Sequence, residues 1–581
     1  MILQNLLFPD ERTCSDEDMY FHKKDKTVMF NTYFNVFSSE KWFLYTRLSS
    51  VSLRLEAIGN FRIQIYSNNI LILEGNYSLP QKGQLAIDIP CCKNCGLISF
   101  AFTPESEDAH LFSGAYITND EDLIRDIHMA IDICTFKREQ YLMRNIEILK
   151  KAILENKESP LYGKVKVYIS DNGRTLDINA IQTKTIKVFP NCNAGGSGGF
   201  TRGIIEILKD KKQYELTHLI FMDDDVIIEP DALIRTYAML SLLKEEYKDS
   251  TIAGAMFRLD LRYVQHEADA IWDGENPITR FPGLDLRSWD AVKKNEEITN
   301  PDYAAWWYAC YSLNVIKEDN LPLPVFIHMD DVEYGIRNQK TIILLNGICV
   351  WHESFENKRA SSLNYYDVRN MLLVNTLYRP TVTQSQIYKY LLKRTGANIL
   401  RYRYKDVFLI YKGVADYCKG IDWLIQQEPE TLNVEIMSLG YTMKPIAELD
   451  GSDAVYEQVK SYTKPTEPTE IYSSKKEVYG KKYIYSLNGW LFPSKNNRVY
   501  AYPIGIWPYA LYRKKRVLLF DPDSQKGILG RKSYVELFRC MVCYLKMVFC
   551  LSRNYEKACK EYKERFTELC GLEFWRGYLK L

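Results

Sequence analysis

Hydrophobic and polar residues alternate along the first part of the chain, from Thr32 to about Ile117, in short runs separated by Gly, Asn and Pro. A period of two predicts half-buried strands, and strands at regular intervals predict a β-sandwich. The segment has no obvious cluster of catalytic residues, so we expect residues 1–118 to form a binding or assembly domain. The predicted strands are residues 51–57, 61–66, 70–73, 84–89 and 97–102.

Near Asn119 the pattern changes to strands that alternate with helices. Strands are expected at 127–135, 165–170, 185–189 and 216–222, and helices at 140–156 and up to Leu208. Such alternation predicts a doubly wound α/β domain with right-handed crossovers, here over residues 119–384.

Beyond Gln384 the chain becomes largely helical and rich in Lys and Tyr, so residues 385–581 are predicted to form a mainly α-helical region. Residues 463–469 have the composition of a linker or exposed loop, and residues 481–519 are aromatic and partly strand-like. Residues 534–578 predict a helix with a mixed apolar and basic face. This face either packs as an oligomer or domain contact or lies on an anionic membrane surface.

Length and composition narrow the class of protein. A chain of 581 residues is too long for one hydrophobic core, so several domains are expected. The net charge of +1 gives no nucleic-acid signature. Cys91, Cys92 and Cys95 have no second ligand pair that would make a zinc site. No signal peptide and no uncharged run of membrane-spanning length are found, so we expect a reduced, cytoplasmic protein.

The apolar strand expected at 216–222 ends in three adjacent carboxylates, Asp223, Asp224 and Asp225. Carboxylate oxygens suit hard divalent ions such as Mg²⁺ or Mn²⁺, which are often shared with substrate phosphates. Ligands of open α/β sheets sit beyond the carboxyl ends of strands. A divalent metal site is one interpretation; a solvated acidic turn that caps the helix beginning near Pro230 is the other.

A glycine-rich run, Asn193-Ala-Gly-Gly-Ser-Gly-Gly-Phe-Thr-Arg-Gly203, follows the third strand of this domain and precedes a helix. It is either a flexible loop or a backbone that approaches a diphosphate closely at a helix N-terminus. It lacks the Gly-Lys-Ser/Thr ending of a Walker loop, and it does not follow the first strand as a Rossmann fingerprint does.

Three later motifs also allow two interpretations. The pair Trp306-Trp307 is either core or a surface on which a sugar stacks. Asp330 and Asp331 begin a helix and are either N-terminal caps or carboxylates held at a site. His352 ends a strand and is either structural or a metal ligand.

Taken in order, these motifs resemble the family 2 glycosyltransferases, which have the GT-A fold. They are most similar to the polymerising galactofuranosyltransferases of bacterial cell walls, over roughly residues 30–380. The segments that carry the resemblance are 135–138, Asp171, 193–200, 223–225, 306–307, 330–337, 351–352 and 365–370, with 31–37 and 41–42 in the sandwich.

The resemblance implies a role for each matched residue. Asp331 would be the catalytic base, and Asp223, Asp225 and His352 would bind Mn²⁺ or Mg²⁺. The sugar and acceptor would meet Trp306, Trp307 and Asp330. The UDP-sugar donor would be held by Arg138, Asp171 (at the uracil), Asn193, Gly195, Gly196, Ser197 and Asp224.

The implied activity is metal-dependent, inverting transfer of galactofuranose from UDP-galactofuranose to a growing cell-envelope, capsular or O-antigen polysaccharide, or to a lipid-linked glycan. No nucleic-acid partner is implied. The alternatives are another donor such as dTDP-rhamnose, a non-catalytic carbohydrate-binding scaffold, and a nucleotidyltransferase. The run Glu353-Ser-Phe355 after His352 departs from the family pattern, which bears on acceptor specificity.

Overall fold

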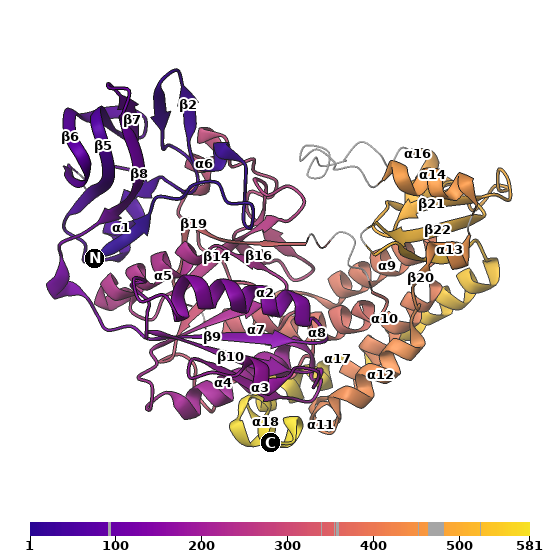
Figure 1. The fold of residues 1–581 in the computed structure, drawn as a ribbon. Coiled ribbons are helices and arrows are strands. Elements are labelled where there is room, and N and C mark those ends of the chain that lie inside the picture. The colour runs from indigo at the N-terminus through magenta and orange to yellow at the C-terminus, as the bar shows by residue number, and fades with distance from the viewer. Residues whose placement is uncertain are drawn as a thin grey trace.

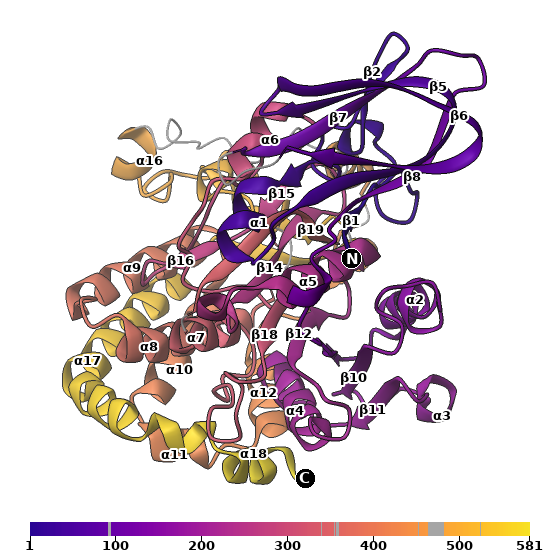
Figure 2. The ribbon, with the colours of Figure 1, turned by 90° about the vertical axis from the view of Figure 1, so that its left-hand side faces the viewer.

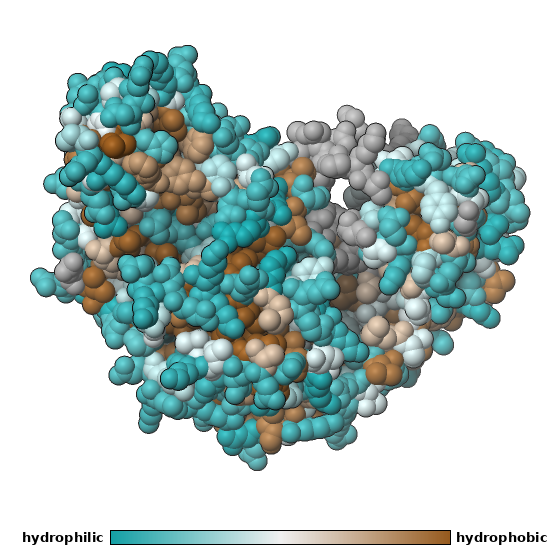
Figure 3. Space-filling model, viewed as in Figure 1, coloured by the Kyte–Doolittle hydropathy of each residue, from teal (hydrophilic) through white to brown (hydrophobic). Residues whose placement is uncertain are grey.

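A computed structural model of the chain describes residues 1–90, 95–338, 340–353, 355, 360–450, 452–462, 481–522 and 524–581. The predicted linker at 463–469, Cys91, Cys92 and Ser354 lie outside these residues. Figure 1 shows a β-rich N-terminal part, a central α/β part and a C-terminal part that is mainly helical. The predicted fold class is therefore confirmed. On the face in Figure 3 the surface is mostly hydrophilic, with hydrophobic side chains gathered toward its centre.

The N-terminal sheet has eight strands and is built around two long ones, β5 (Val51–Ser67) and β6 (Ile70–Ile89). The four short strands predicted over this stretch are all strand, but the predicted breaks at 58–60 and 74–83 are wrong, because each pair joins into one continuous strand. The other strands are β1 (Ile2–Asn5), β2 (His22–Lys24), β3 (Thr27–Met29), β4 (Phe37–Ser38), β7 (Leu97–Pro104) and β8 (His110–Ile117).

A shift in strand register at Gly59 divides β5 into two halves that pair with different neighbouring strands. The first half of β5 pairs with β8 and the second half with β7. Gly59 has φ +83°, and a Cβ there would lie 2.6 Å from the Cα of Ala109, so the bend requires glycine. The sheet curls over itself around this bend, which gives the predicted sandwich (Figure 2).

The central sheet has nine strands, and its first half is parallel. The strand order is β11-β10-β9-β12-β18-β14-β19-β13, with β15 paired to β14. The strands are β9 (Met129–Thr135), β10 (Val165–Asp171), β11 (Ile186–Pro190), β12 (His218–Asp223), β13 (Ile227–Ile228), β14 (Thr251–Arg258), β15 (Gln265–Glu267), β18 (Ala309–Ser312) and β19 (Ile342–His352).

Helices cover this sheet and join the strands. They are α2 (Glu139–Leu149), α4 (Gly195–Asp210), α5 (Pro230–Leu242), α7 (Asp330–Arg337) and α8 (Leu363–Tyr378). The chain runs from β9 outward to β11 and then returns to place β12 on the other side of β9. The order of the strands therefore reverses between β9 and β12, and such a switch point is where open α/β sheets bind ligands.

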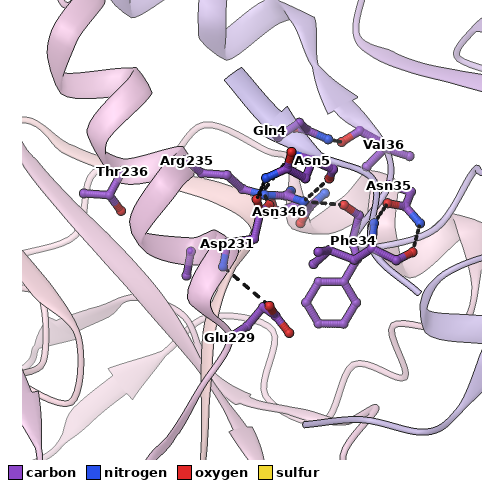
Figure 4. Close-up of polar contacts among 12 residues, drawn as sticks. Gln4, Asn5, Phe34, Asn35, Val36, Glu229, Asp231, Arg235, Thr236 and Asn346 are labelled. Carbon is purple, nitrogen blue, oxygen red and sulfur yellow. Dashed lines mark hydrogen bonds and ion pairs between the residues drawn. The ribbon is translucent and has the colours of Figure 1, made fainter. Parts of the chain in front are cut away.

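A buried ion pair joins the N-terminal part to the central one (Figure 4). Arg235 of α5 donates to Asp231 at 2.6 Å, and both side chains are at most 3% exposed. The guanidinium also donates to the carbonyl of Phe34 at 2.7 Å, and the Asn5 side chain donates to Asp231 at 2.8 Å. Because Asn5 and Phe34 belong to the N-terminal part, this pair helps to fix how the two parts are docked.

In the C-terminal part, α10 (Tyr404–Tyr417) and the long α17 (Tyr534–Arg565) pack against α8, and α9 (Gln384–Leu400) packs against α10 and α17. A four-stranded sheet adds to it, in the order β20-β23-β22-β21. Its strands are β20 (Lys444–Pro445), β21 (Val499–Pro503), β22 (Arg516–Asp521) and β23 (Lys526–Arg531). The described residues contain no helix that is both long and apolar enough to cross a bilayer.

Candidate active site

Two acidic residues and one histidine meet where β12 and β19 end. Asp223, Asp225 and His352 each offer one ligand atom, and these atoms lie within 4.8 Å of one another. His352 Nε2 is 3.1 Å from Asp225 Oδ1. The short strand β13 pairs antiparallel with the end of β19, and this pairing holds the acidic turn beside the histidine. The helix after the turn is capped by Glu229, so these aspartates do not serve as its cap.

The histidine is oriented by a backbone carbonyl. His352 Nδ1 is 2.5 Å from the carbonyl oxygen of Glu353, a contact that requires the proton on Nδ1. Nε2 is then the ring nitrogen that faces Asp225. A hydrogen bond of this kind from the other ring nitrogen is the usual support of a histidine metal ligand.

Asp224 lines the same cleft as the cluster but is largely buried. It accepts hydrogen bonds from Thr135 at 2.7 Å and from Arg138 at 3.2 Å, and it is 4% exposed. Arg138 also contacts Asp225 at 2.7 Å. Asp224 was expected to bind the donor. Its contacts give it a structural role as well, because it positions Arg138 beside the metal ligands.

The cluster carries more negative charge than its surroundings balance. Burial raises the pKa of Asp223 to about 7, and repulsion from Asp225 adds to the shift, while His352 opposes it. Two carboxylate oxygens and one imidazole nitrogen are a donor set that binds divalent cations. The residues present therefore fit a divalent metal ion, which would neutralise this charge.

A second pair of carboxylates, Asp330 and Asp331, begins α7. The loop before them takes left-handed backbone conformations at three residues that are not glycine, and each such residue costs ~1–3 kcal/mol. The side-chain amide of Asn370 in α8 holds this loop through the carbonyls of three of its residues, at 2.9–3.0 Å. The left-handed residues are Phe326, His328 and Met329.

Neither aspartate is the N-cap residue. Met329 occupies that position, and the Asp331 carboxylate accepts the N–H of Val332 at 2.8 Å. Of the two interpretations of this pair, the N-cap role is therefore excluded for both residues, because the helix has already begun at Asp330. Burial raises the pKa of Asp330 to about 7, with repulsion from Asp331 as the next cause. Burial also raises the pKa of Asp331 to about 6, against the lowering effects of the Val332 N–H and of His328.

Both acidic groups line one cleft of about 1290 Å³. The cleft extends from the switch point of the central sheet to α9 of the C-terminal part. Asn193, Gly195 and Gly196 also line it, as do Arg138, Trp306 and Trp307. A cleft of this size accommodates a nucleotide sugar together with an acceptor.

The glycine-rich run is not a loop, because α4 begins at Gly195 and most of the run lies in its first turns. Gly195 has φ +70°, and a Cβ there would lie 1.9 Å from the carbonyl oxygen of Phe326. A Cβ at Gly199 would lie 2.0 Å from Cys134 Sγ. Gly195 lets the N-terminus of α4 lie directly against the loop before α7, Gly199 lets α4 pack on β9, and the Asp330 carboxylate lies close to Gly196.

Two of the residues that were expected to bind the donor form hydrogen bonds with the protein's own backbone instead. The Asp171 carboxylate accepts the N–H groups of Gly173, Thr175 and Leu176 at 2.8–3.0 Å. The Ser197 hydroxyl donates to the carbonyl of Leu323 at 2.6 Å, and the residue is fully buried. Both side chains therefore stabilise the local fold. Within the described part of the chain, neither is among the residues that line the cleft.

The two tryptophans are largely buried. Trp306 is 4% exposed and stacks on Phe221 with ring centroids 4.4 Å apart. Trp307 is 8% exposed and donates its indole N–H to the carbonyl of Gly254 at 2.9 Å. The pair therefore packs largely in the core, and both residues also line the cleft.

Sequence analysis missed several residues of the cleft. Glu267 of β15 lines it, and burial raises the pKa of this carboxyl to about 8. His328 also lines it and is 2.7 Å from Asp367 of α8, which in turn pairs with Arg394 of α9. The available signal for Glu267 was the polar run His266-Glu-Ala-Asp269, but the three-residue strand β15 is too short for a period that would show which side chains face the cleft.

Comparison with known proteins found a match for the N-terminal part of the chain and two relatives over a longer span. Residues 11–119 match the family model described as galactofuranosyltransferase 2 N-terminal. The chain is 26% identical over 432 residues to galactofuranosyltransferase GlfT2 of Mycolicibacterium smegmatis and 25% identical over 435 residues to that of Mycobacterium tuberculosis. Each match covers 68% of this chain, and 64% and 66% of the respective relative, which is just under two thirds of its length. The resemblance to galactofuranosyltransferases is thereby confirmed.

Among solved structures, a mannosyltransferase of Pyrobaculum calidifontis in complex with GDP-mannose and Mn²⁺ aligns with 54% of this chain and 85% of its own length. The sequences are 7% identical and the TM-score is 0.29, too low to carry an argument about this chain.

Proposed function

We propose that this chain is a metal-dependent, inverting galactofuranosyltransferase that uses UDP-galactofuranose as its donor. The observation that carries the proposal is that the Asp223–Asp225–His352 cluster and the Asp330–Asp331 pair line one cleft. Such a reaction needs both a cation at the diphosphate and a base at the acceptor. The similarity to two galactofuranosyltransferases supports the choice of sugar.

On the donor side, Asp223, Asp225 and His352 would hold Mn²⁺ or Mg²⁺. When bound, the metal would stabilise the negative charge of the departing UDP. Arg138 stands beside these ligands with 46% of its side chain exposed, so its guanidinium can meet a phosphate oxygen. The N-terminus of α4, with Asn193, Gly195 and Gly196 at the cleft, offers backbone N–H groups to the donor.

On the acceptor side, Asp331 would remove the proton of the attacking hydroxyl. The acceptor oxygen then forms a bond to the anomeric carbon while the bond from that carbon to the diphosphate oxygen breaks, and UDP leaves with the electron pair. One displacement from the face opposite the leaving group inverts the anomeric configuration. Asp330 and Glu267 are neutral at pH values below their raised pKa values, and each can then donate a hydrogen bond to a sugar hydroxyl.

The acceptor in this proposal is a growing cell-envelope polysaccharide or a lipid-linked glycan. The cleft extends past the catalytic groups to Tyr390, Arg394 and Asn398 of α9. This extension leaves room for several sugars of an acceptor beyond the one that reacts. We also propose that the protein meets such an acceptor at a membrane that it contacts peripherally.

A donor screen tests the proposal. The purified full chain would be incubated with Mn²⁺, a short galactofuranose oligosaccharide and either UDP-galactofuranose, UDP-galactopyranose or dTDP-rhamnose, and the products weighed by mass spectrometry. We expect chain extension with UDP-galactofuranose and none with Asp223→Ala. Extension only from dTDP-rhamnose would reassign the donor. Binding of the oligosaccharide without transfer from any donor would favour a non-catalytic scaffold.

A further inference from the structure

The helix α12 (Pro429–Leu439) belongs to the C-terminal part, yet it borders the cleft. Its buried side chains pack in one cluster with Phe326 of the loop before α7. Two further residues of the helix, Asn433 and Met437, line the cleft itself. The C-terminal part is therefore placed where it can influence the groups that bind substrate.

Glu430, in the first turn of α12, contacts the segment that precedes the glycine-rich helix α4. One of its carboxylate oxygens, Oε1, accepts the backbone N–H of Asn193 at 2.8 Å. The same oxygen accepts a hydrogen bond from the Arg174 guanidinium at 3.2 Å. Asn193 lies just before α4, and Arg174 belongs to the turn that follows β10. One carboxylate of the C-terminal part therefore joins two loops of the central part.

Further hydrogen bonds connect these two loops to the cleft. The Arg174 guanidinium also donates to the carbonyl of Asn191 at 3.0 Å, and the Asn191 amide donates to Asn172 at 2.9 Å. The Asn172 amide in turn donates to the carbonyl of Gly195, at the start of α4, at 2.9 Å. Asn172, Asn193 and Gly195 all line the cleft. The carboxylate on α12 is thus bonded to a network whose other end lies on the donor side.

The last residues of the chain hold α12 in this place. Glu428 is the N-cap residue of α12, and its carboxylate pairs with Lys580 at 2.9 Å. The helix before Lys580, α18 (Leu572–Leu579), packs on α4. The Cys192 thiol donates to the carbonyl of Tyr578 in this helix at 3.9 Å. The end of the chain thus fixes α12 beside the segment that leads into α4 (Figure 2).

The contacts of Glu430 are suited to positioning the loops rather than to stabilising the fold. The side chains of Arg174 and Glu430 are 53% and 36% exposed, and an ion pair this exposed contributes little to the free energy of unfolding. A charged oxygen that accepts a backbone N–H is a stronger and more directional contact. It fixes the backbone of Asn193, whose own side chain accepts the N–H of Gly195 at 3.2 Å.

We propose that Glu430 is a positioning residue for donor binding, which holds Asn193 and the turn of Arg174 in the conformation that receives the nucleotide. This inference rests on the proposed function, because the nucleotide is part of the proposed donor. In the described part of the chain Glu430 is not among the residues that line the cleft, so it acts through its neighbours. A change at Glu430 therefore affects the binding of UDP more than the rate of transfer from bound donor.

Calorimetric titration of the full chain with UDP in Mn²⁺ tests the proposal. Glu430→Ala should bind UDP roughly 2- to 30-fold more weakly than the parent, which is the range for residues that act without touching the ligand. Glu430→Gln should recover most of that affinity, because its amide oxygen can still accept the Asn193 N–H. In transfer assays Glu430→Ala should raise the KM for UDP-galactofuranose, while kcat and the KM for the acceptor stay close to those of the parent.

Glu435→Ala is the matched control on the same helix. Glu435 pairs with Lys412 of α10 at 3.0 Å, and its side chain is 54% exposed, so the variant removes a similar ion pair away from the donor side. It should bind UDP like the parent, and both alanine variants should melt close to it. Equal affinity for UDP in the parent and Glu430→Ala, or an equal loss in Glu435→Ala, would overturn the inference and leave the proposed function standing. A parent protein that binds no UDP in Mn²⁺ would overturn both.

Discussion

The metal-free protein should be destabilised by one of its own metal ligands. In the folded chain burial and the neighbouring Asp225 raise the pKa of Asp223 from 3.8 to about 7. Between pH 3.8 and about pH 7, the Asp223 carboxyl has therefore lost its proton in the unfolded chain but keeps it in the folded chain. The folded state therefore binds more protons, and the free energy of unfolding falls as the pH rises through this range. Above pH 7 the free energy of unfolding is lowered by the full amount.

The size of the effect follows from the shift. The difference between 3.8 and about 7, at 1.36 kcal/mol per pKa unit, is about 4 kcal/mol. Asp223→Asn is neutral at every pH and removes this loss. In EDTA above pH 7 the variant should therefore melt higher than the parent, by roughly 8–16 °C for a cooperative unit of ~150–250 residues. Added Mn²⁺ should raise the Tm of the parent but not of the variant.

Asp330→Asn is the matched control, because burial raises the pKa of Asp330 to a similar value and Asp330 lies outside the metal cluster. It should also stabilise the metal-free protein, yet keep the response to Mn²⁺. Scanning calorimetry in EDTA and in Mn²⁺ at several pH values measures both effects. An Asp223→Asn protein that melts lower than the parent in EDTA, or that still responds to Mn²⁺, would refute the reasoning.

Three further predictions concern the docking contact and the base. Arg235→Met should lower the free energy of unfolding by ~3–5 kcal/mol in urea, because it leaves Asp231 buried without its cation, and adding Asp231→Asn should recover most of that loss. Gly347→Ala should cost at least ~3 kcal/mol in the same assay, since φ is +85° and its Cβ would lie 1.9 Å from the Arg235 guanidinium; a near-neutral result would contradict the contact. His328→Gln should move the acid limb of the kcat/KM profile to higher pH, because His328 lowers the pKa of Asp331. His328→Lys should keep the limb near that of the parent. An unmoved limb in His328→Gln would exclude an effect of His328 on the base.

Sequence patterns predicted those parts of the site that end regular strands. Asp223 and His352 each follow an apolar strand, and strand ends of an α/β sheet meet at one edge. The closeness of Asp225 and His352 was implied only by the family resemblance and not by the strand pattern, because it depends on the antiparallel pairing of the two-residue strand β13 with β19. A strand that short leaves no periodic signal in the sequence.

The roles of other residues depended on neighbours that are distant in sequence. Asp171 has the residue type and position of a donor-binding carboxylate, yet three backbone N–H groups of the following turn occupy it. The glycines of α4 are typical of a phosphate loop, yet Gly199 is required by the thiol of Cys134 on β9. His328 gains its significance from Asp367, which lies on another helix. Local patterns do not reveal such long-range contacts.

The most direct test of the central claim compares Asp331→Asn with Asp330→Asn in single-turnover transfer from UDP-galactofuranose. Asparagine keeps the size of either side chain but cannot remove the acceptor proton. We expect Asp331→Asn to bind UDP and Mn²⁺ like the parent, to melt no lower than it, since the variant removes a buried carboxyl with a raised pKa, and to transfer ~10²- to 10⁴-fold more slowly. Asp330→Asn should retain measurable transfer. Near-normal transfer by Asp331→Asn, with loss in Asp330→Asn, would contradict the assignment of the base.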